Sequence, residues 1–555
     1  MSVESAMPGA PLDTSPPARK TRHCLRVLPD EPIPARWEVS VLLLARWRVE
    51  RVLQWRNHAR ANSLAILRHA SIQLSKVDVP AFSELPDILS RIVGTFQTEQ
   101  LDDLSELTDD VRAVVSILEY LKGPRQLSDA ITSVIRAGAL EVLVAMLQSE
   151  STAVNTASAA LITAIAASHS EHTKAVVEAG AVPHLTALLD TANGELRNEV
   201  VWALGNVAGD SSSLRDIVLR EIDVSLLLGI TASLLVTGPT KHAGNAMWLS
   251  HNLCRGKPPP PDDILETFLE VSARAIDHPF DDVVQNGAWA LACIGDRLPD
   301  IVIQTKCLPR LCEITSSRAT ALSSITAPPD GEDGDGNVRW GLGGEDRVLT
   351  GAIRVLGNLV TSTDMHTQAV LDAGALEALE PLLITSPKDV LKEVCWFISN
   401  ITAGTVDQVG MVCSLGLVPP IVEHLRSNTC VKVRKESAWA LANLATCGSP
   451  EHIQTAVDAG TLEAFVEGLD IADQRVASVI LDGLEAIFSV STIEDDDEFE
   501  EDERYRHYKC PPSWLRQFDD FGGLDALVHL SSHGPNQTIT NKAEAIVSKL
   551  GGPLD

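Results

Sequence analysis

A short motif, Trp followed four residues later by Asn, recurs through the middle of the chain. It occurs at Trp202/Asn206, Trp248/Asn252, Trp396/Asn400 and Trp439/Asn443. Trp289 continues the series with Cys293 in the Asn place, and Arg354/Asn358 continues it with Arg in the Trp place. Successive motifs are 46 (202 to 248), 41 (248 to 289), 42 (354 to 396) and 43 (396 to 439) residues apart. Self-similarity at one long period is typical of stacked helical repeats.

A glycine between two small or apolar residues recurs with the same period. It is found at Gly138, Gly180, Gly374, Gly416 and Gly460, and each is followed by an apolar, helix-like segment. Glycine supplies the left-handed backbone that a sharp turn between two helices requires. The glycines are 42 (138 to 180), 42 (374 to 416) and 44 (416 to 460) residues apart. Two markers with a period in the low forties predict armadillo or HEAT repeats.

The fold class predicted from these repeats is all-α, an armadillo-repeat right-handed α-solenoid whose stacked repeats line a long groove. We expect the array to cover about residues 82–490. The longer interval of 65 residues (289 to 354) contains a Pro-, Gly- and Asp-rich segment, which predicts an inserted loop at about 321–347. An acidic linker at 491–510 precedes an atypical C-terminal armadillo repeat at 511–555, and residues 1–75 form an N-terminal tail.

The charge is distributed unevenly along the chain. The whole chain has 45 basic and 75 acidic residues, a net charge of −30. Residues 1–70 have 11 basic and 6 acidic residues, a net of +5, which leaves −35 for the rest. A strongly acidic body repels phosphates, so nucleic acid is excluded as its partner and basic proteins are favoured. No segment has the roughly twenty apolar residues of a membrane span, and the N-terminus lacks a signal-peptide core. We therefore expect a soluble intracellular protein without a membrane partner.

Motifs for catalysis or metal binding are absent from the sequence. There is no Gly-rich phosphate loop, no nucleophile elbow and no HExxH. The ten cysteines include no CxxC pair, and the fifteen histidines have no metal-ligand spacing. We expect no catalytic residue, no metal and no cofactor, and reduced, mostly buried thiols.

The paired Trp and Asn predict a binding surface. On the helix that contains Trp439 and Asn443, these two residues share one stripe, whereas Leu441 and Leu444 point away toward the core. Each Trp could instead simply pack in the core. That alternative is weaker when an Asn accompanies it, because a buried amide needs a partner. On a surface stripe, Asn can bind a peptide backbone, and neighbouring indoles can hold the stems of Lys or Arg.

These segments are similar to those of importin-α, the adaptor family of nuclear import. Residues 201–210 (VWALGNVAGD) resemble the family's third repeat, and residues 248–257 (WLSHNLCRGK) resemble its fourth. Residues 354–363, 396–404 and 435–443 resemble its sixth, seventh and eighth. The resemblance covers most of residues 100–490 and the C-terminal repeat.

The resemblance implies two sites for basic nuclear localisation signals. The first site would use Thr173, Trp202, Asn206, Asp210, Trp248, Asn252 and Trp289, with Asp210 and Thr173 holding the deepest lysine. The second site would use Arg354, Asn358, Thr367, Glu393, Trp396, Asn400, Glu436, Trp439 and Asn443.

Several positions of the first site depart from the family. Ala160 and Ala164 occupy the Trp and Asn places of the second repeat, Asn286 stands where an acidic residue is usual, and Cys293 stands where Tyr is usual. We therefore expect cargo preference to shift toward the second site.

Residues 36–57 resemble the family's importin-β-binding helix in degenerate form. Its basic residues would be Arg36, Arg46, Arg48, Arg51 and Arg56. Apolar Leu42–Leu44 replace several basic positions, so contact with importin-β should be weak and salt-sensitive. An amphipathic helix that merely caps the array is the alternative.

The further partners implied are a nuclear export receptor at the C-terminal repeat and importin-β. The acidic run before that repeat could equally be a solubilising spacer. The resemblance also implies a monomer that shuttles between cytoplasm and nucleus. The alternative function is an armadillo scaffold that binds other proteins and carries no cargo.

Overall fold

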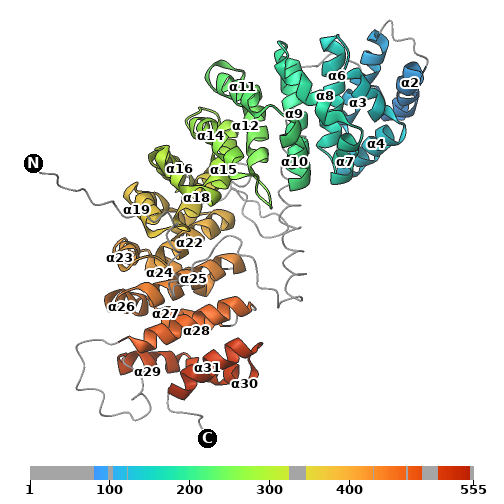
Figure 1. The fold of residues 1–555 in the computed structure, drawn as a ribbon. Helices are drawn as coiled ribbons and strands as arrows, with labels where there is room; N and C mark the ends of the chain where they lie inside the picture. The colour runs from blue at the N-terminus through green and yellow to red at the C-terminus, as the bar shows by residue number, and fades with distance from the viewer. Residues whose placement is uncertain are drawn as a thin grey trace, which may run out of the picture.

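The computed structural model describes residues 80–97, 104–121, 123–323, 346–428, 430–469, 473–490 and 510–549. Within these ranges every regular element is a helix and no strand occurs, which confirms the all-α class. Figure 1 shows the helices following one another from the N-terminal to the C-terminal end in an elongated, curved stack. The importin-β-binding-like helix at 36–57, most of the insertion at 321–347 and nearly all of the acidic linker lie outside the described residues. The hand of the superhelix stays a prediction.

Most repeats consist of a short first helix, a second helix and a longer third helix. The first helices are α4 (Pro124–Arg136), α7 (Ser170–Glu178), α10 (Ser212–Glu221), α13 (Asp262–Thr267), α16 (Pro299–Gln304), α19 (Asp364–Asp372), α23 (Val406–Ser414), α26 (Pro450–Asp458) and α29 (Pro512–Asp520). The second helices are α2 (Leu85–Gln97) after η1 (Phe82–Glu84), α5 (Ala139–Met146), α8 (Ala181–Ala187) with η2 (Leu188–Asp190), α11 (Val224–Thr237), α14 (Leu269–Ala275), α17 (Leu308–Ser323), α20 (Ala375–Leu379) with α21 (Leu382–Thr385), α24 (Val418–Ser427), α27 (Thr461–Gly468) and α30 (Gly523–His533).

The third helices form one continuous layer, which we call the third-helix layer. Its members are α3 (Ser105–Tyr120), α6 (Thr152–Ala166), α9 (Gly194–Asp210), α12 (Thr240–Cys254), α15 (Asp281–Arg297), α18 (Arg347–Val360), α22 (Lys388–Thr402), α25 (Val431–Cys447), α28 (Gln474–Ser489) and α31 (Gln537–Lys549). Each member packs against the one before and the one after it. The layer therefore presents the same positions of successive repeats side by side.

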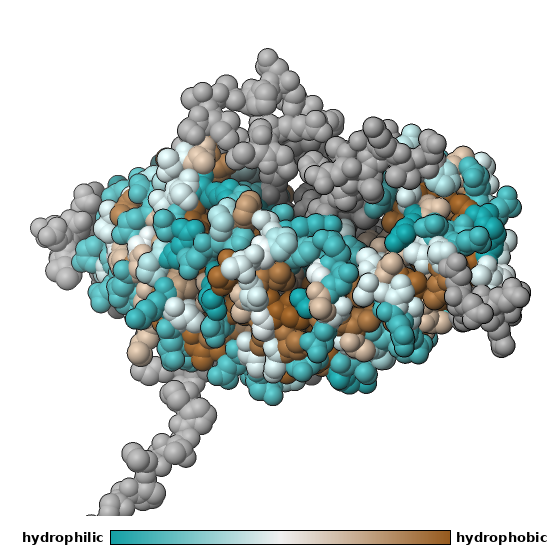
Figure 2. Space-filling view, turned by 90° about the horizontal axis from the view of Figure 1, so that it is seen from above, coloured by the Kyte–Doolittle hydropathy of each residue, from teal (hydrophilic) through white to brown (hydrophobic). Residues whose placement is uncertain are grey.

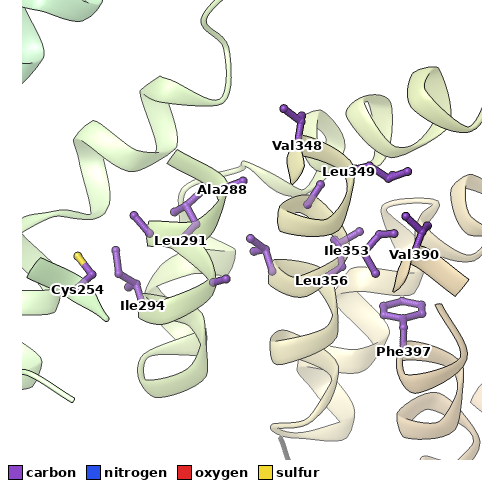
Figure 3. Close-up of a cluster of buried hydrophobic side chains, with 14 of the residues drawn as sticks. Cys254, Ala288, Leu291, Ile294, Val348, Leu349, Ile353, Leu356, Val390 and Phe397 are labelled. Atoms are coloured by element: carbon purple, nitrogen blue, oxygen red, sulfur yellow. The ribbon is translucent and has the colours of Figure 1, made fainter. Parts of the chain in front are cut away.

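The hydrophobic core continues past the insertion between α17 and α18. Figure 3 shows Leu291 and Ile294 on α15 and Ile353 and Leu356 on α18 among one cluster of buried side chains, which extends to Phe397 on α22. Ile294, Ile353, Leu356 and Phe397 are each 0 % exposed. The inserted residues consequently leave the packing of the neighbouring third helices intact.

The turns between first and second helices have the predicted left-handed glycines. Gly138, Gly180, Gly374, Gly416 and Gly460 have φ between +68° and +94°, and Gly522 opens α30 in the same way. Lys306, between α16 and α17, has φ +61° and is the non-glycine exception among the described residues. A side chain with a Cβ is disfavoured in this left-handed region. Lys306 is therefore less well suited to its backbone conformation than the glycines at the equivalent turns.

The surface is mostly polar, and the apolar residues lie mainly between helices. On the face shown in Figure 2, hydrophobic residues reach the surface in streaks between hydrophilic ones. Within the described ranges no single helix is long and apolar enough to cross a membrane. Only α23 and α24 together, bent by 81°, reach that length and composition.

Candidate functional site

The tryptophans of the motif all lie on the third-helix layer, and two of them pack over a glycine of the preceding third helix. Trp248 on α12 lies against Gly205 on α9, where an added Cβ would come within 2.8 Å of the indole Cδ1. Trp396 on α22 lies against Gly357 on α18, where an added Cβ would overlap Cζ3 of the indole. Both glycines stand three residues after the Trp place of their own helix. A small residue there makes room for the next indole.

The small residue recurs at this position. The residues three places after the Trp place are Thr163, Gly205, His251, Ala292, Gly357, Ser399 and Ala442. His251 is the large exception.

The asparagines tie consecutive helices of the layer together. Four of their Nδ2 groups donate to a backbone carbonyl of the preceding third helix, each at the position three residues after the Trp place. These bonds are Asn206 to Thr163 (3.3 Å), Asn252 to Gly205 (3.0 Å), Asn358 to Ala292 (2.7 Å) and Asn443 to Ser399 (2.8 Å). Asn400 instead donates to Trp396 O of its own helix, at 2.8 Å. The Asn therefore has a structural role that the sequence pattern did not indicate.

The same asparagines keep an acceptor unused. No hydrogen-bond partner is found among the described residues for the Oδ1 atoms of Asn252, Asn358, Asn400 and Asn443. These side chains are 0 %, 6 %, 0 % and 0 % exposed, respectively. The expectation that the stripe lies at the helix surface is therefore wrong for them. The bond to the preceding helix draws the amides of Asn252, Asn358 and Asn443 inward, and Asn400 is bonded to its own helix. A buried acceptor without a partner is costly, so each oxygen favours binding a donor.

The remaining members of the stripe differ in burial. Trp202 and Trp396 are each 4 % exposed, whereas Trp248, Trp289 and Trp439 are half-buried. The core positions are as expected, since Leu441 and Leu444 are each 1 % exposed.

The second set of predicted residues is linked by charge. Arg354 on α18 donates to Glu393 Oε1 on α22 at 2.5 Å, and Lys392 Nζ lies 2.8 Å from the same oxygen. The Arg354 guanidinium also lies over the Trp396 ring, 4.9 Å from its centroid. Glu393 is 4 % exposed, so this carboxylate is desolvated and held by two cations. Glu436 on α25 is half-buried.

The first set also has a cation of its own. Lys241 Nζ at the start of α12 lies 5.3 Å from the centre of the Trp202 ring. On α9, burial raises the pKa of Glu199 to about 7, and the positive charge of Lys241 opposes that rise. At the other end of α9, Asp210 is 9 % exposed and accepts a hydrogen bond from Ser170 at 2.8 Å. Asp210, the one carboxylate of this set, therefore lies at the end of α9, and Glu199, which is outside the set, lies earlier on the same helix.

The two predicted threonines are buried between helices. Thr173 on α7 is 1 % exposed and its hydroxyl donates to Ala166 O at 3.0 Å, at the end of α6. Thr367 on α19 is 0 % exposed and donates to Val360 O at 3.1 Å, at the end of α18. Both hydroxyls thus fasten a first helix to the preceding third helix. That Thr173 directly holds the deepest lysine of the signal stays a prediction.

The four positions that depart from the family pattern lie on the third helices α6 and α15. Ala164 on α6 is 6 % exposed, and Ala160 is half-buried. Asn286 on α15 is 6 % exposed and donates to Asp282 O at 2.8 Å. Burial raises the pKa of the Cys293 thiol to about 12, so this cysteine is a neutral thiol rather than a nucleophile. In the described part of the chain, no group of three His, Cys, Asp or Glu side chains is arranged to hold a metal.

We expect Gly357→Ala to destabilise the protein. Its Cβ would overlap the Trp396 ring, and overpacking costs about 1–3 kcal/mol, more than the gain of about 1 kcal/mol in helix propensity. Gly229→Ala in α11 is the matched control, because a Cβ there meets nothing within 4 Å; it should raise the melting temperature. Thermal unfolding of both variants checks this. An equal rise in both would show that Trp396 does not lie against Gly357.

Comparison with known proteins gives one consistent result. The Armadillo/beta-catenin-like repeat family model matches residues 169–209, 362–403 and 405–446. The chain is 31% identical over 469 residues to importin subunit alpha-1b of Oryza sativa subsp. japonica, covering 83% of this chain and 79% of that protein. It is 31% identical over 513 residues to importin subunit alpha-1a of the same plant, covering 90% and 88%.

A solved structure agrees on the fold. The crystal structure of an engineered protein superposes with a TM-score of 0.67 at 24% identity, over 84% of this chain and 99% of that one.

Proposed function

The chain belongs to the importin-α family, and we propose that it is a nuclear import adaptor that binds basic nuclear localisation signals and links them to importin-β. As an armadillo protein of this family of transport adaptors, it is not an enzyme. The signals would bind along the third-helix layer, in the groove that the stacked repeats form. The adaptor would act as a monomer and shuttle between cytoplasm and nucleus, and an export receptor would contact the C-terminal repeat.

The observation that carries the proposal is the row of asparagine oxygens. Asn252, Asn358, Asn400 and Asn443 each have an Oδ1 without a partner among the described residues, and each lies one turn from a Trp or from Arg354. Because these oxygens are buried, the backbone N–H groups of an extended peptide would reach them as donors only when the amides turn toward the groove. Such contacts bind a peptide irrespective of its sequence. The indoles and the carboxylates Asp210, Glu393 and Glu436 would then select for basic side chains.

The proposal is tested by binding of a fluorescent Lys/Arg-rich peptide to the full chain. We expect a Kd in the micromolar range or tighter that weakens with added salt, because exposed charge attraction is screened. A peptide in which Glu replaces every Lys and Arg is the matched control and should not bind. Absence of binding of the basic peptide at physiological salt would favour the scaffold alternative.

We further propose that the second set of residues contributes more affinity than the first. The first set lacks its motif at Ala160 and Ala164, and Lys241 already lies over Trp202. The combined substitution of Glu393 and Trp396 by alanine should therefore cost more affinity for a basic peptide than Asp210→Ala. Isothermal titration with one peptide measures both losses. The reverse order would contradict the shift toward the second set.

A further inference from the structure

Two tryptophans of the motif have a cation of the chain itself over the ring. Lys241 Nζ lies 5.3 Å from the centre of the Trp202 ring, and the Arg354 guanidinium lies 4.9 Å from that of Trp396. These two indoles are each 4 % exposed, whereas the other tryptophans of the motif are half-buried. A cargo cation that stacks on either indole would therefore meet a place that a cation of the chain already occupies.

The two cations are held in different ways. Arg354 forms an ion pair with Glu393, a carboxylate that is 4 % exposed, so its guanidinium is a fixed part of the second set. Lys241 is exposed, and it forms no ion pair with any of the described residues. A lysine ammonium sits on a flexible four-carbon stem. Lys241 can therefore leave the Trp202 ring without breaking a buried ion pair.

The place over Trp202 attracts positive charge. Burial raises the pKa of Glu199, one turn before Trp202 on α9, to about 7, and the positive charge of Lys241 opposes that rise. Burial also raises the pKa of Glu119 on α3, and the same positive charge opposes it. The ammonium group of Lys241 thus acts on two carboxylates and one indole. These are the kinds of group that would attract a basic side chain of a peptide.

We propose that Lys241 is a displaceable competitor of the cargo, an internal cation that covers Trp202 until a lysine or arginine of a basic signal replaces it. This inference rests on the proposed function, and it specifies how the first set of residues is regulated. Because Lys241 is tethered beside the ring, its local concentration there is high. The first set therefore binds a basic peptide more weakly than it would with Trp202 uncovered. Arg354, in contrast, stays over Trp396 when the peptide binds.

The test measures binding of a fluorescent five-lysine peptide to the full chain at physiological salt. Trp396→Ala with Asn400→Ala is used as the background, so that binding to the first set is measured. Lys241→Met removes the charge and keeps an unbranched side chain. We expect it to raise the affinity at least about threefold, because an exposed cation–π contact corresponds to roughly two- to fivefold in an equilibrium constant. Lys241→Arg keeps a cation over the ring and should give no gain.

Lys174→Met on α7 is the matched control for net charge, because Lys174 is also exposed. It should change the affinity by less than about 1.5-fold. Adding Trp202→Leu, which keeps an apolar side chain without the π face, should abolish the gain from Lys241→Met.

If the peptide binds and Lys241→Met raises its affinity no more than Lys174→Met does, the inference is overturned and the proposed function stands. The same holds if the chain without substitutions binds the peptide and the background variant does not, with or without Lys241→Met. If the peptide does not bind even to the chain without substitutions, both fail.

Discussion

Replacing Trp396 and Asn400 together with alanine lowers the affinity of the full chain for a Lys/Arg-rich peptide by at least about 30-fold, which corresponds to about 2 kcal/mol. A buried indole at the centre of an interface is typical of residues whose truncation has effects of this size. Asn400 adds an acceptor without a partner among the described residues. Its Nδ2 bonds only its own helix, so removing it breaks no tie between repeats.

Fluorescence anisotropy with one peptide measures this loss, and circular dichroism confirms that the helices remain. Asn443→Ala is the informative comparison, because it removes the same kind of acceptor and also the bond to Ser399 O. We expect Asn443→Ala to lower the melting temperature as well as the affinity, whereas Asn400→Ala should lower mainly the affinity. Unchanged peptide binding in the Trp396 and Asn400 double variant would contradict the position of the second site.

Arg215→Ala should destabilise the repeat that contains α10 by about 3 kcal/mol. The side chain is 1 % exposed, and its Nη1 donates to Arg255 O at 2.7 Å and to Pro258 O at 3.0 Å. It thereby joins α10 to the segment that follows α12. Its removal leaves two carbonyls without their donor and a large void in the core, and each effect costs on the order of 1–3 kcal/mol.

Urea unfolding followed by circular dichroism measures the effect as a shift of the first transition, since repeats unfold with their neighbours. Arg220→Ala on the same helix is the matched control. Its side chain is exposed, and its loss should change the stability by no more than about 0.5 kcal/mol. Arg215→Met, which keeps most of the volume, should fall between the two. Equal stability of the Arg215 and Arg220 alanine variants would show that the buried guanidinium does not hold the segment.

The repeat architecture was predictable because both markers have a local physical cause. A left-handed turn favours glycine, so recurring glycines such as Gly138 and Gly460 mark the helix junctions. Lys306 was missed because its turn adopts the same backbone without a glycine. Arg215 was missed for a different reason, since nothing local distinguishes an arginine that contacts a loop 40 residues away.

The site was predictable in composition and less so in geometry. The spacing of Trp and Asn placed both residue types on one layer, but it did not reveal that Asn252 and Asn443 donate to the preceding helix. A signal for the helix contact was present in the sequence, namely the small residue three places after each Trp, as at Gly205 and Gly357. The same rule would have singled out His251. The cations beside Trp202 and Trp396 depend on tertiary packing, which a single-helix pattern does not contain.

The central claim is that this chain links basic cargo to importin-β. The most direct measurement mixes the full chain with importin-β and a fluorescent basic peptide and follows all three by size-exclusion chromatography at physiological salt. We expect the three to elute together, and the complex with importin-β to weaken when Arg46, Arg48 and Arg51 are replaced by alanine. Elution of the chain with the peptide but without importin-β would contradict the adaptor function and identify the protein as a peptide-binding armadillo scaffold.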